Sequence, residues 1–452
     1  IETAGDRENG PLEFRLQYTD LAGNSGEEVT STTDETQVTM DTEAPDLSGY
    51  TLTVNGSSGF TAKPGDVLKL EISTTESIST PTVKLAGQSV DASGSESGWS
   101  AQRELLVSDT EGEIAVELIL TDAAGNTLTL THPQSETGNL LASYPFSGNA
   151  NDASGHNRNA TVTGATLSTD RHGRLQSAYH FDGSNDYVTV ADDNSLSSTS
   201  SLTISAWFKK VSGSGWMSLV GKGTSDANEE YALMLKDDQV YFDVGQGGGP
   251  YLQQSTTIAP ETWHHIAAVH TRSGSASTLK VYLNGEDVGG TTVSASNTPN
   301  DNSHPLTIGS RFSTSVNLGF EGQIDEVQIW NKALDTSQLL MRANTVRLDT
   351  STPTLSDITL ASSSTFSGWA KSGDTLTLAF TSSEAIPAPT VTLAEASVTA
   401  TNASGNGTSW RATYPVMDDD SGDVTFSISY ADPAGNAGES KDESSVQNTI
   451  TI

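Results

Sequence analysis

The sequence predicts an all-β protein in which β-sandwich modules flank a jelly-roll sandwich that is inserted before the last strand of the middle module. Three observations predict this arrangement. Stretches of alternating apolar and polar residues, such as residues 67–72 and 375–380, are separated by Gly, Ser, Asp and Asn, a pattern typical of half-buried antiparallel strands. The segment 36–48 recurs as 344–356. The block between the two copies carries different recurring phrases and more aromatic residues.

A second recurring phrase indicates where the repeat is interrupted. Thr-Asp-Leu-Ala-Gly-Asn at residues 19–24 recurs in similar form at 121–126 and 431–436. In the first copy the closing strand, residues 36–41, follows soon afterwards, whereas in the middle copy it comes only near Val346. The predicted domains are therefore 1–41, the C-terminal part of one repeat; 42–137 plus 344–350, a split module; 138–343, the jelly roll; and 351–452, a further module.

Two nearly full copies of the repeat align well. Lys63–Asp66 matches Lys371–Asp374, and Trp99 matches Trp410. Copies of about 95 residues with frequent turns suit a seven-strand immunoglobulin-like sandwich. Residues 1–41 contain only the tail of such a module, so its strands lack the partners needed to bury a core.

With their Asp-x-x-x-Pro linkers and the Thr-Asp-x-Ala-Gly-Asn phrase, these modules resemble the bacterial immunoglobulin-like repeats of large, RTX-type surface adhesins. The resemblance implies a stalk of tandem sandwiches whose short linkers bind calcium and become stiff. The ligands that it implies are Asp41, Glu43 and Asp46 at the first linker, Asp349 and Asp357 at the second, and Asp20, Asp122 and Asp432 from neighbouring loops. The alternative is that these side chains cap the backbone of their own turns.

The chain is strongly acidic. Its 452 residues include 22 Lys plus Arg and 57 Asp plus Glu, a formal net charge of −35. Such a chain repels phosphate backbones and anionic membranes, so we expect no nucleic-acid partner. The charge fits a solvated, aggregation-resistant surface, and it also fits carboxylates gathered for calcium, which prefers oxygen ligands.

The absence of cysteine excludes disulfides and thiolate chemistry. No run of 18 apolar residues exists, so we expect no membrane insertion. The chain starts inside a repeat, which suggests a monomeric segment of a longer protein. Together with the adhesin resemblance, these features favour an extracellular or cell-surface location.

The inserted block alternates through about a dozen strands, as a jelly roll of two broad sheets does, and only residues 336–344 suggest a short helix. Its phrases at 181–188, 263–267 and 322–330 resemble those of the laminin-G and pentraxin-type concanavalin A-like jelly roll. That resemblance implies one structural calcium site formed by Asp152 and Asp325. The alternative for Asp152 is that it caps its own Ser-Gly turn.

A ligand site is predicted on the rim of this jelly roll. The loop 224–230 lies where pentraxins bind ligand through calcium, but Ser310–Ser313 replaces their acidic partner loop, so a double calcium site does not fit. An arginine beside acidic and amide groups can instead clamp a sugar. The predicted binding residues are Asp226, Asn228, Glu230 and Arg311, with Trp216 and Tyr251 stacking on the sugar. The alternatives are an ordinary polar rim, with Trp216 covering the sandwich edge, or a site around Asp182, Asn185 and Asp186.

Catalytic motifs are scarce. There is no Gly-x-Ser-x-Gly and no His-Glu-x-x-His, and the nearest carboxylate pair, Asp325 and Glu326, points to opposite strand faces. We therefore expect no enzymatic activity. The sequence favours an adhesin segment that presents a lectin-like jelly roll to extracellular glycans on a calcium-stiffened stalk. The alternatives are a non-catalytic targeting module of a secreted polysaccharide-degrading enzyme and a spacer without a ligand.

Overall fold

The computed structural model describes residues 9–133, 138–197, 201–211, 215–224, 229–237, 239–245, 251–294, 303–312, 318–403, 405, 407–446 and 449–452. Contacts divide the chain into two compact units. Unit 1 comprises residues 1–51, 69–103 and 115–132, and unit 2 comprises 52–68, 104–114 and 133–452. Strands dominate both units, which confirms the predicted all-β class. Among the described residues, no helix has the length and apolar character needed to cross a membrane.

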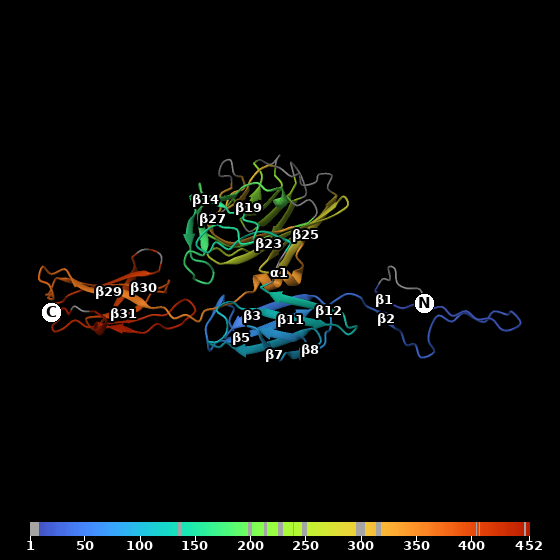
Figure 1. Ribbon diagram of the computed structural model, residues 1–452, viewed down its shortest axis with the longest axis horizontal. Helices are drawn as coiled ribbons and strands as arrows, with labels where there is room; N and C mark the ends of the chain where they lie inside the picture. The colour runs from blue at the N-terminus through green and yellow to red at the C-terminus, as the bar shows by residue number, and fades with distance from the viewer. Residues whose placement is uncertain are drawn as a thin grey trace. The chain divides into compact units, whose positions relative to one another are not determined.

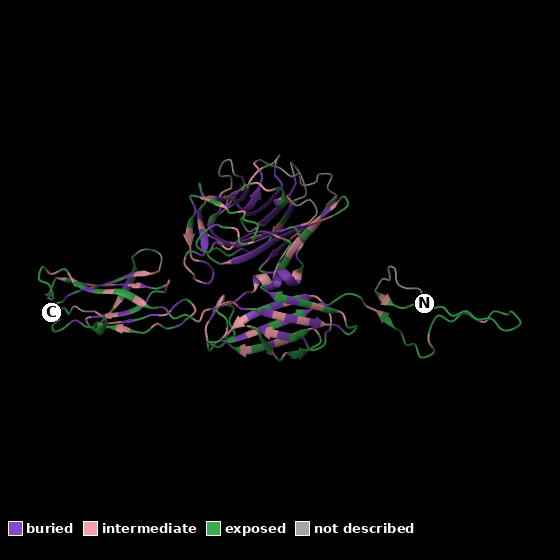
Figure 2. Cartoon of the chain, viewed as in Figure 1, coloured by how far each residue is buried: buried purple, intermediate pink, exposed green. Residues whose placement is uncertain are grey.

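Residues 47–132 contain two four-stranded sheets, and burial alternates along their longer strands such as β5 and β11. In β5, Leu68, Leu70 and Ile72 are buried while the residues between them are not, and Figure 2 shows the resulting stripes. This alternation buries one face of each sheet. In order, the sheets are β3 (Leu47–Val54), β5 (Val67–Thr74), β9 (Gly98–Glu104) and β8 (Ser93–Ser95); and β12 (Thr127–His132), β11 (Val116–Thr121), β6 (Thr82–Leu85) and β7 (Gln88–Val90).

Residues 9–41 form an extended hairpin without a core. β1 (Gly10–Pro11) pairs with β2 (Thr39–Met40), and Leu16 pairs with Val29. The apolar side chains along this hairpin are exposed, Leu16 by 54%, and the segment is largely green in Figure 2. A lone hairpin cannot bury both sides of its apolar stripe.

The jelly roll in unit 2 consists of an eight-stranded and a seven-stranded sheet packed face to face (Figure 1). Between them lies a continuous core that includes Phe181, Phe208 and Phe320. The first sheet contains, in order, β15 (Thr166–Ser168), β16 (Ala178–Asp182), β27 (Glu321–Trp330), β18 (Ser201–Lys210), β23 (His264–Ser273), β24 (Ala276–Leu283) and β25 (Glu286–Ser294), with β13 (Leu140–Tyr144) also on β27.

The second jelly-roll sheet has seven strands. Its strands are, in order, β14 (Thr161–Thr163), β17 (Tyr187–Val190), β26 (Leu306–Ile308), β19 (Trp216–Lys222), β20 (Tyr231–Lys236), β21 (Gln239–Val244) and β22 (Tyr251–Ser255). A 3₁₀ turn, η1 (Asn194–Leu196), follows β17. The helix α1 (Thr336–Ala343) begins at a capping box formed by Asp335 and Gln338, which confirms the predicted short helix.

The segment that follows the jelly roll returns to strands that precede it. β28 (Arg347–Leu348) pairs antiparallel with β10 (Gly112–Glu113) and parallel with β4 (Thr61–Ala62), all within unit 2. The amide of Ile114 also donates to the carbonyl of Val346. A strand so far along the chain thus pairs with two strands that precede the jelly roll, and the insertion and the domain boundaries stay a prediction.

The C-terminal strands form a further seven-stranded arrangement with its own core. Phe380, Trp410 and Ile428 lie at its centre and are buried. The strand order is β29 (Leu355–Ser362), β30 (Thr375–Ser382), β33 (Ser409–Pro415), β32 (Ala396–Asn402), β31 (Thr390–Leu393), β34 (Phe426–Ser429) and β35 (Lys441–Asp442), followed by the 3₁₀ turn η3 (Glu443–Ser445).

Candidate functional site

Three carboxylates meet beside the second linker. Asp349 follows β28, Glu384 follows β30 and Asp432 follows β34, and one oxygen from each lies within 4.8 Å of the others. Asp432 is buried, and the other two are half-buried. Three different loops therefore supply this group, which we call the C-terminal triad.

A second group of the same composition lies beside the first linker. Asp41 follows β2, Glu76 follows β5 and Asp122 follows β11, again with one oxygen from each within 4.8 Å of the others. Its members occupy the same repeat positions as those of the C-terminal triad, and the pattern of burial is the same. We call it the N-terminal triad.

An asparagine holds each linker against the Thr-Asp-x-Ala-Gly-Asn loop. Asn436 Nδ2 donates to the Asp349 carbonyl at 3.1 Å and to Asp432 Oδ2 at 2.8 Å. In the N-terminal triad, Asn126 Nδ2 donates to the Asp41 carbonyl at 3.2 Å and to Asp122. The recurring phrase thus orients its aspartate and fixes the backbone of the linker that supplies the next carboxylate.

In each triad the glutamate has a raised pKa, and in the C-terminal triad burial raises the pKa of Asp349 as well. Burial, together with the charges of Asp349, Asp432 and Glu111, raises the pKa of Glu384 to about 7. Burial and the charges of the neighbouring acids raise the pKa of Glu76 as well. Each glutamate therefore lies in an uncompensated negative field.

Burial opposes ionisation of Asp122, but hydrogen bonds from Asn126 and Gly125 outweigh it and lower its pKa. Within the described ranges, none of the six triad carboxylates forms an ion pair with Lys or Arg. Several hard oxygen ligands with unbalanced charge fit the donor set that calcium takes.

The structure brings together four of the predicted metal ligands and leaves the others apart. Asp41 and Asp122 lie in one triad, and Asp349 and Asp432 in the other. Asp20 caps its own turn through Ala22 and Asn24. The other three predicted ligands belong to neither described triad: Glu43, Asp46 and Asp357.

Glu76 and Glu384 are triad members that the ligand prediction omitted. Glu76 in one repeat aligns with Glu384 in the other. That recurrence of an acid in the loop after the second long strand was the available signal. The recurrence could be recognised as part of a ligand set only once the structure placed this loop beside the linker.

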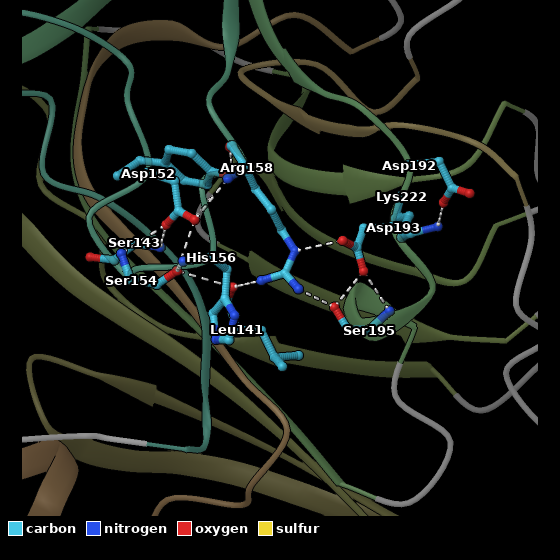
Figure 3. A network of polar contacts seen from close by, with 11 residues as sticks. Leu141, Ser143, Asp152, Ser154, His156, Arg158, Asp192, Asp193, Ser195 and Lys222 are labelled. Atoms are coloured by element: carbon cyan, nitrogen blue, oxygen red, sulfur yellow. Dashed lines mark hydrogen bonds and ion pairs between the residues drawn. The ribbon is translucent and has the colours of Figure 1, made fainter.

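Asp152 and Asp325 have separate partners. Asp152 accepts hydrogen bonds from the amides of Ser143, Ser154 and Arg158, as Figure 3 shows. Asp325 is fully buried, and its Oδ2 lies 3.6 Å from Arg171 Nη1. Burial and the charge of Glu326 raise the Asp325 pKa well above its usual range. Asp152 thus occupies the turn-capping role given as its alternative, and the metal role of the pair stays a prediction.

On the predicted ligand rim, the described charges are engaged with one another. Arg311 Nε donates to Glu229 Oε2 at 2.6 Å, and Glu230 pairs with the fully buried Lys222 at 3.1 Å. Trp216 is 38% exposed, and its ring centroid lies 4.3 Å from that of Tyr241. Asp226, Asn228 and the side chain of Tyr251 lie outside the described part of the structure.

The alternative rim around residues 182–186 is also internally bonded. Asp182 Oδ1 accepts the amides of Ser184 and Asn185, and Asp186 Oδ2 accepts the amide of Asp182. These acids close the turn between β16 and β17. Neither prediction for a rim site is tested by these contacts.

Comparison with known proteins identifies the inserted block. Residues 182–339 match the family described as the concanavalin A-like lectin/glucanases superfamily, so the chain contains a jelly-roll domain of that superfamily. Among curated proteins, none matches the sequence.

Several solved structures are similar to part of the chain. Domain 4 of AbnA, a GH43 extracellular arabinanase from Geobacillus stearothermophilus in complex with arabinotriose, is 20% identical, covers 44% of this chain and 96% of its own, and gives a TM-score of 0.33. The SAP-like pentraxin of Limulus polyphemus is 17% identical over 36% of this chain and 80% of its own, with a TM-score of 0.30. The CBM40 of the Ruminococcus gnavus IT-sialidase, bound to alpha2,3 sialyllactose, is 14% identical over 37% and 96%, with a TM-score of 0.32. At these identities and TM-scores the similarities say nothing about the ligand of this chain.

Proposed function

We propose that this chain is a segment of an extracellular adhesin that presents a carbohydrate-binding jelly roll on a stalk of immunoglobulin-like modules. The observation that supports it most is a lectin/glucanase-type jelly roll placed between β12 and β28. Because the chain leaves and re-enters strand-forming segments at both ends of the insert, the jelly roll has two covalent tethers. Two tethers restrict its orientation more than a single linker would.

The stalk linkers bind calcium in this proposal. The two triads support it, since each gathers three carboxylates from loops at equivalent positions of two repeats. A cation there would join the linker aspartate to loops of the following strands and reduce bending at the linker. Asp41 and Asp349 would be the ligands from the linkers, and Glu76 and Glu384 would be ligands from the loops after β5 and β30.

The jelly roll binds its glycan without hydrolysing it in this proposal. Glycosidases place two carboxylates about 5 to 9.5 Å apart around an accessible bond. The nearest sequence pair does not offer this arrangement, because the Asp325 side chain is fully buried. The expectation that Asp325 and Glu326 point to opposite faces was wrong: Glu326 has a positive φ of 47° at a register shift between β18 and β27, and both carboxylates face Arg171. A carboxyl group buried completely against Arg171 cannot contact a polysaccharide.

A glycan array probed with the full chain tests the glycan-binding function. We expect retention of a defined group of glycans without release of reducing sugar. Repeating the array in EDTA separates the two parts of the proposal, because glycan binding by the jelly roll does not require the triads. Absence of retention on every glycan would contradict the lectin role, and released sugar would contradict the non-catalytic role.

A further inference from the structure

A groove of about 380 Å³ lies on the outer face of the second jelly-roll sheet. Its floor is formed by β14 and β17, whose registered pairs are Thr161 with Thr189 and Thr163 with Tyr187. Val162 packs against the core, so its two neighbours on β14 point to the opposite, outer face. The complete lining is Asn159, Thr161, Thr163, Tyr187, Thr189, Ala191 and Pro305.

Most hydrogen-bonding groups of this groove have no protein partner. In the described part of the chain, the side-chain hydroxyls of Thr161, Thr163 and Tyr187 make no hydrogen bond. Asn159 uses its Oδ1 to accept the amide of Asp152 at 3.0 Å, which orients its side chain and leaves Nδ2 as a donor. Facing pairs on adjacent strands lie about 5 Å apart, so these groups form a compact array.

The walls of the groove are held by the network in Figure 3. Asn159 follows Arg158, whose amide donates to Asp152 and whose Nε lies 3.1 Å from Asp193. Ala191 precedes Asp192, which pairs with Lys222 at 2.9 Å.

The remaining wall is anchored by the same buried lysine. Pro305 follows His304, whose carbonyl accepts a hydrogen bond from Lys222 Nζ at 3.0 Å. Each wall residue is therefore adjacent to a residue fixed by Arg158 or Lys222. A site built in this way is organised before any ligand arrives, which lowers the entropic cost of binding.

The groove is uncharged although the chain carries a net charge of −35. The seven lining residues include no Asp, Glu, His, Lys or Arg. The two acids beside it, Asp192 and Asp193, are paired with Lys222 and Arg158. An anionic ligand finds no cation in the lining, and a cationic ligand finds no carboxylate there.

We propose that this groove binds a neutral saccharide, with the Tyr187 ring against a sugar face and the hydroxyls and the Asn159 amide bonding to sugar hydroxyls. The inference rests on the proposed glycan-binding function and assigns it a site and a ligand class. Sugars combine hydroxyl pairs with apolar ring faces, so they match an array of hydroxyls beside an aromatic ring. This site differs from the rim around Arg311, whose charges pair with one another.

The test uses the full chain on an array that contains both neutral glycans and sialylated or uronic acid glycans. Wild type is compared with Tyr187→Ala and with the double variant Thr161→Val, Thr163→Val. Thr278→Val on β24, in the other sheet, is the matched control. We expect neutral glycans to be retained by wild type and by the control, and binding to weaken about tenfold or more in both groove variants. Unfolding temperatures of all four proteins verify that the fold is retained.

The outcomes separate this inference from the proposed function. Neutral glycans bound equally by wild type and both groove variants would overturn the groove and leave the glycan-binding function standing. Retention of acidic glycans alone by wild type would also overturn the groove and leave the glycan-binding function standing. Retention of no glycan by wild type would overturn both. Trp216→Ala, measured in parallel, should leave the binding of neutral glycans unchanged. Loss of that binding in Trp216→Ala would place the site on the rim and overturn the groove.

Discussion

Arg171 Nη2 donates a hydrogen bond to Oγ1 of Thr345 at 3.1 Å, joining the early part of the jelly roll to the segment that follows it. The guanidinium also lies 3.0 Å from a Glu326 oxygen and 4.4 Å from the centroid of the Trp207 ring. Phe60, just before β4, is edge-on to that ring at 5.3 Å. One buried cation therefore contacts two jelly-roll acids and the residue that leads into β28.

Removal of Arg171 should destabilise unit 2 strongly. In Arg171→Ala the fully buried Asp325 loses its cation, and we expect a loss of about 3 to 5 kcal/mol in the free energy of unfolding. Urea denaturation measures the change. The control is Lys280→Ala, which breaks the exposed pair with Asp287 and should cost at most about 1 kcal/mol. Equal midpoints for the two variants would contradict the role of the buried cluster.

Calcium should raise the unfolding temperature through the triads. A ligand bound only by the native state adds about 2.7 kcal/mol at a hundredfold excess over its Kd. We expect Glu384→Gln to reduce this calcium-dependent increase, since it removes one anionic ligand from the C-terminal triad. Asp357→Asn is the control, because that exposed linker acid lies outside both described triads and Asn tolerates its positive φ of 51°. An unfolding temperature unchanged by calcium and by EDTA would end the calcium proposal.

Without calcium, Glu384 should make stability depend on pH near neutrality. Its folded pKa of about 7 exceeds its usual value of 4.5, so between these values the folded state holds a proton that the unfolded state has released. This contribution is fully present below pH 4.5 and is lost as pH rises through 7.

The buried His172 and His270 have lowered pKa values and act in the opposite direction, because they favour the folded state at higher pH. The prediction therefore concerns the difference between wild type and Glu384→Gln, measured in EDTA at pH 5 and pH 7.5. The variant should gain stability relative to wild type as pH rises across this range. A difference that does not change with pH would contradict the raised pKa.

Arg311→Ala should weaken the fold. Glu229 is nearly fully buried and accepts two hydrogen bonds from Arg311, so the variant leaves a buried carboxylate without this partner. With these contacts in view we expect Arg311→Ala to lower the unfolding temperature by several degrees, whereas Arg411→Ala, an exposed arginine of β33, should not. An unchanged unfolding temperature for Arg311→Ala would contradict this expectation.

Deletion of residues 138–343, with the ends joined by a short Gly-Ser linker, should leave a folded module. The expectation follows from the pairing of β28 with β4 and β10, which the deletion retains. The deletion also exposes Phe60, so Phe60→Ser should be included to limit aggregation. Circular dichroism and a cooperative melt measure folding. A product without a cooperative transition, with and without Phe60→Ser, would contradict the insertion.

Several features could be predicted because they depend on residues that are close together in the sequence. Alternating apolar residues identified the strands, and the short helix at residues 336–344 followed from its apolar positions. The recurring phrases identified Asp122 and Asp432 as loop residues near the linkers, and the triads contain both. Repeats are informative because a module with the same sequence pattern places the same residue at the same point of the fold.

The sequence by itself determined the all-β class, the presence of a concanavalin A-like jelly roll and the acids that recur near the two triads. Only the tertiary structure decided which groups meet: Glu76 and Glu384 complete the triads, Arg311 is paired with Glu229, and Arg171 contacts Thr345. The groove over β14 and β17 also emerged only there, since its walls come from three loops held by Arg158 and Lys222. Periodicity fixes which face of a strand is buried, but strand order and register across the sheets fix which distant loops lie together.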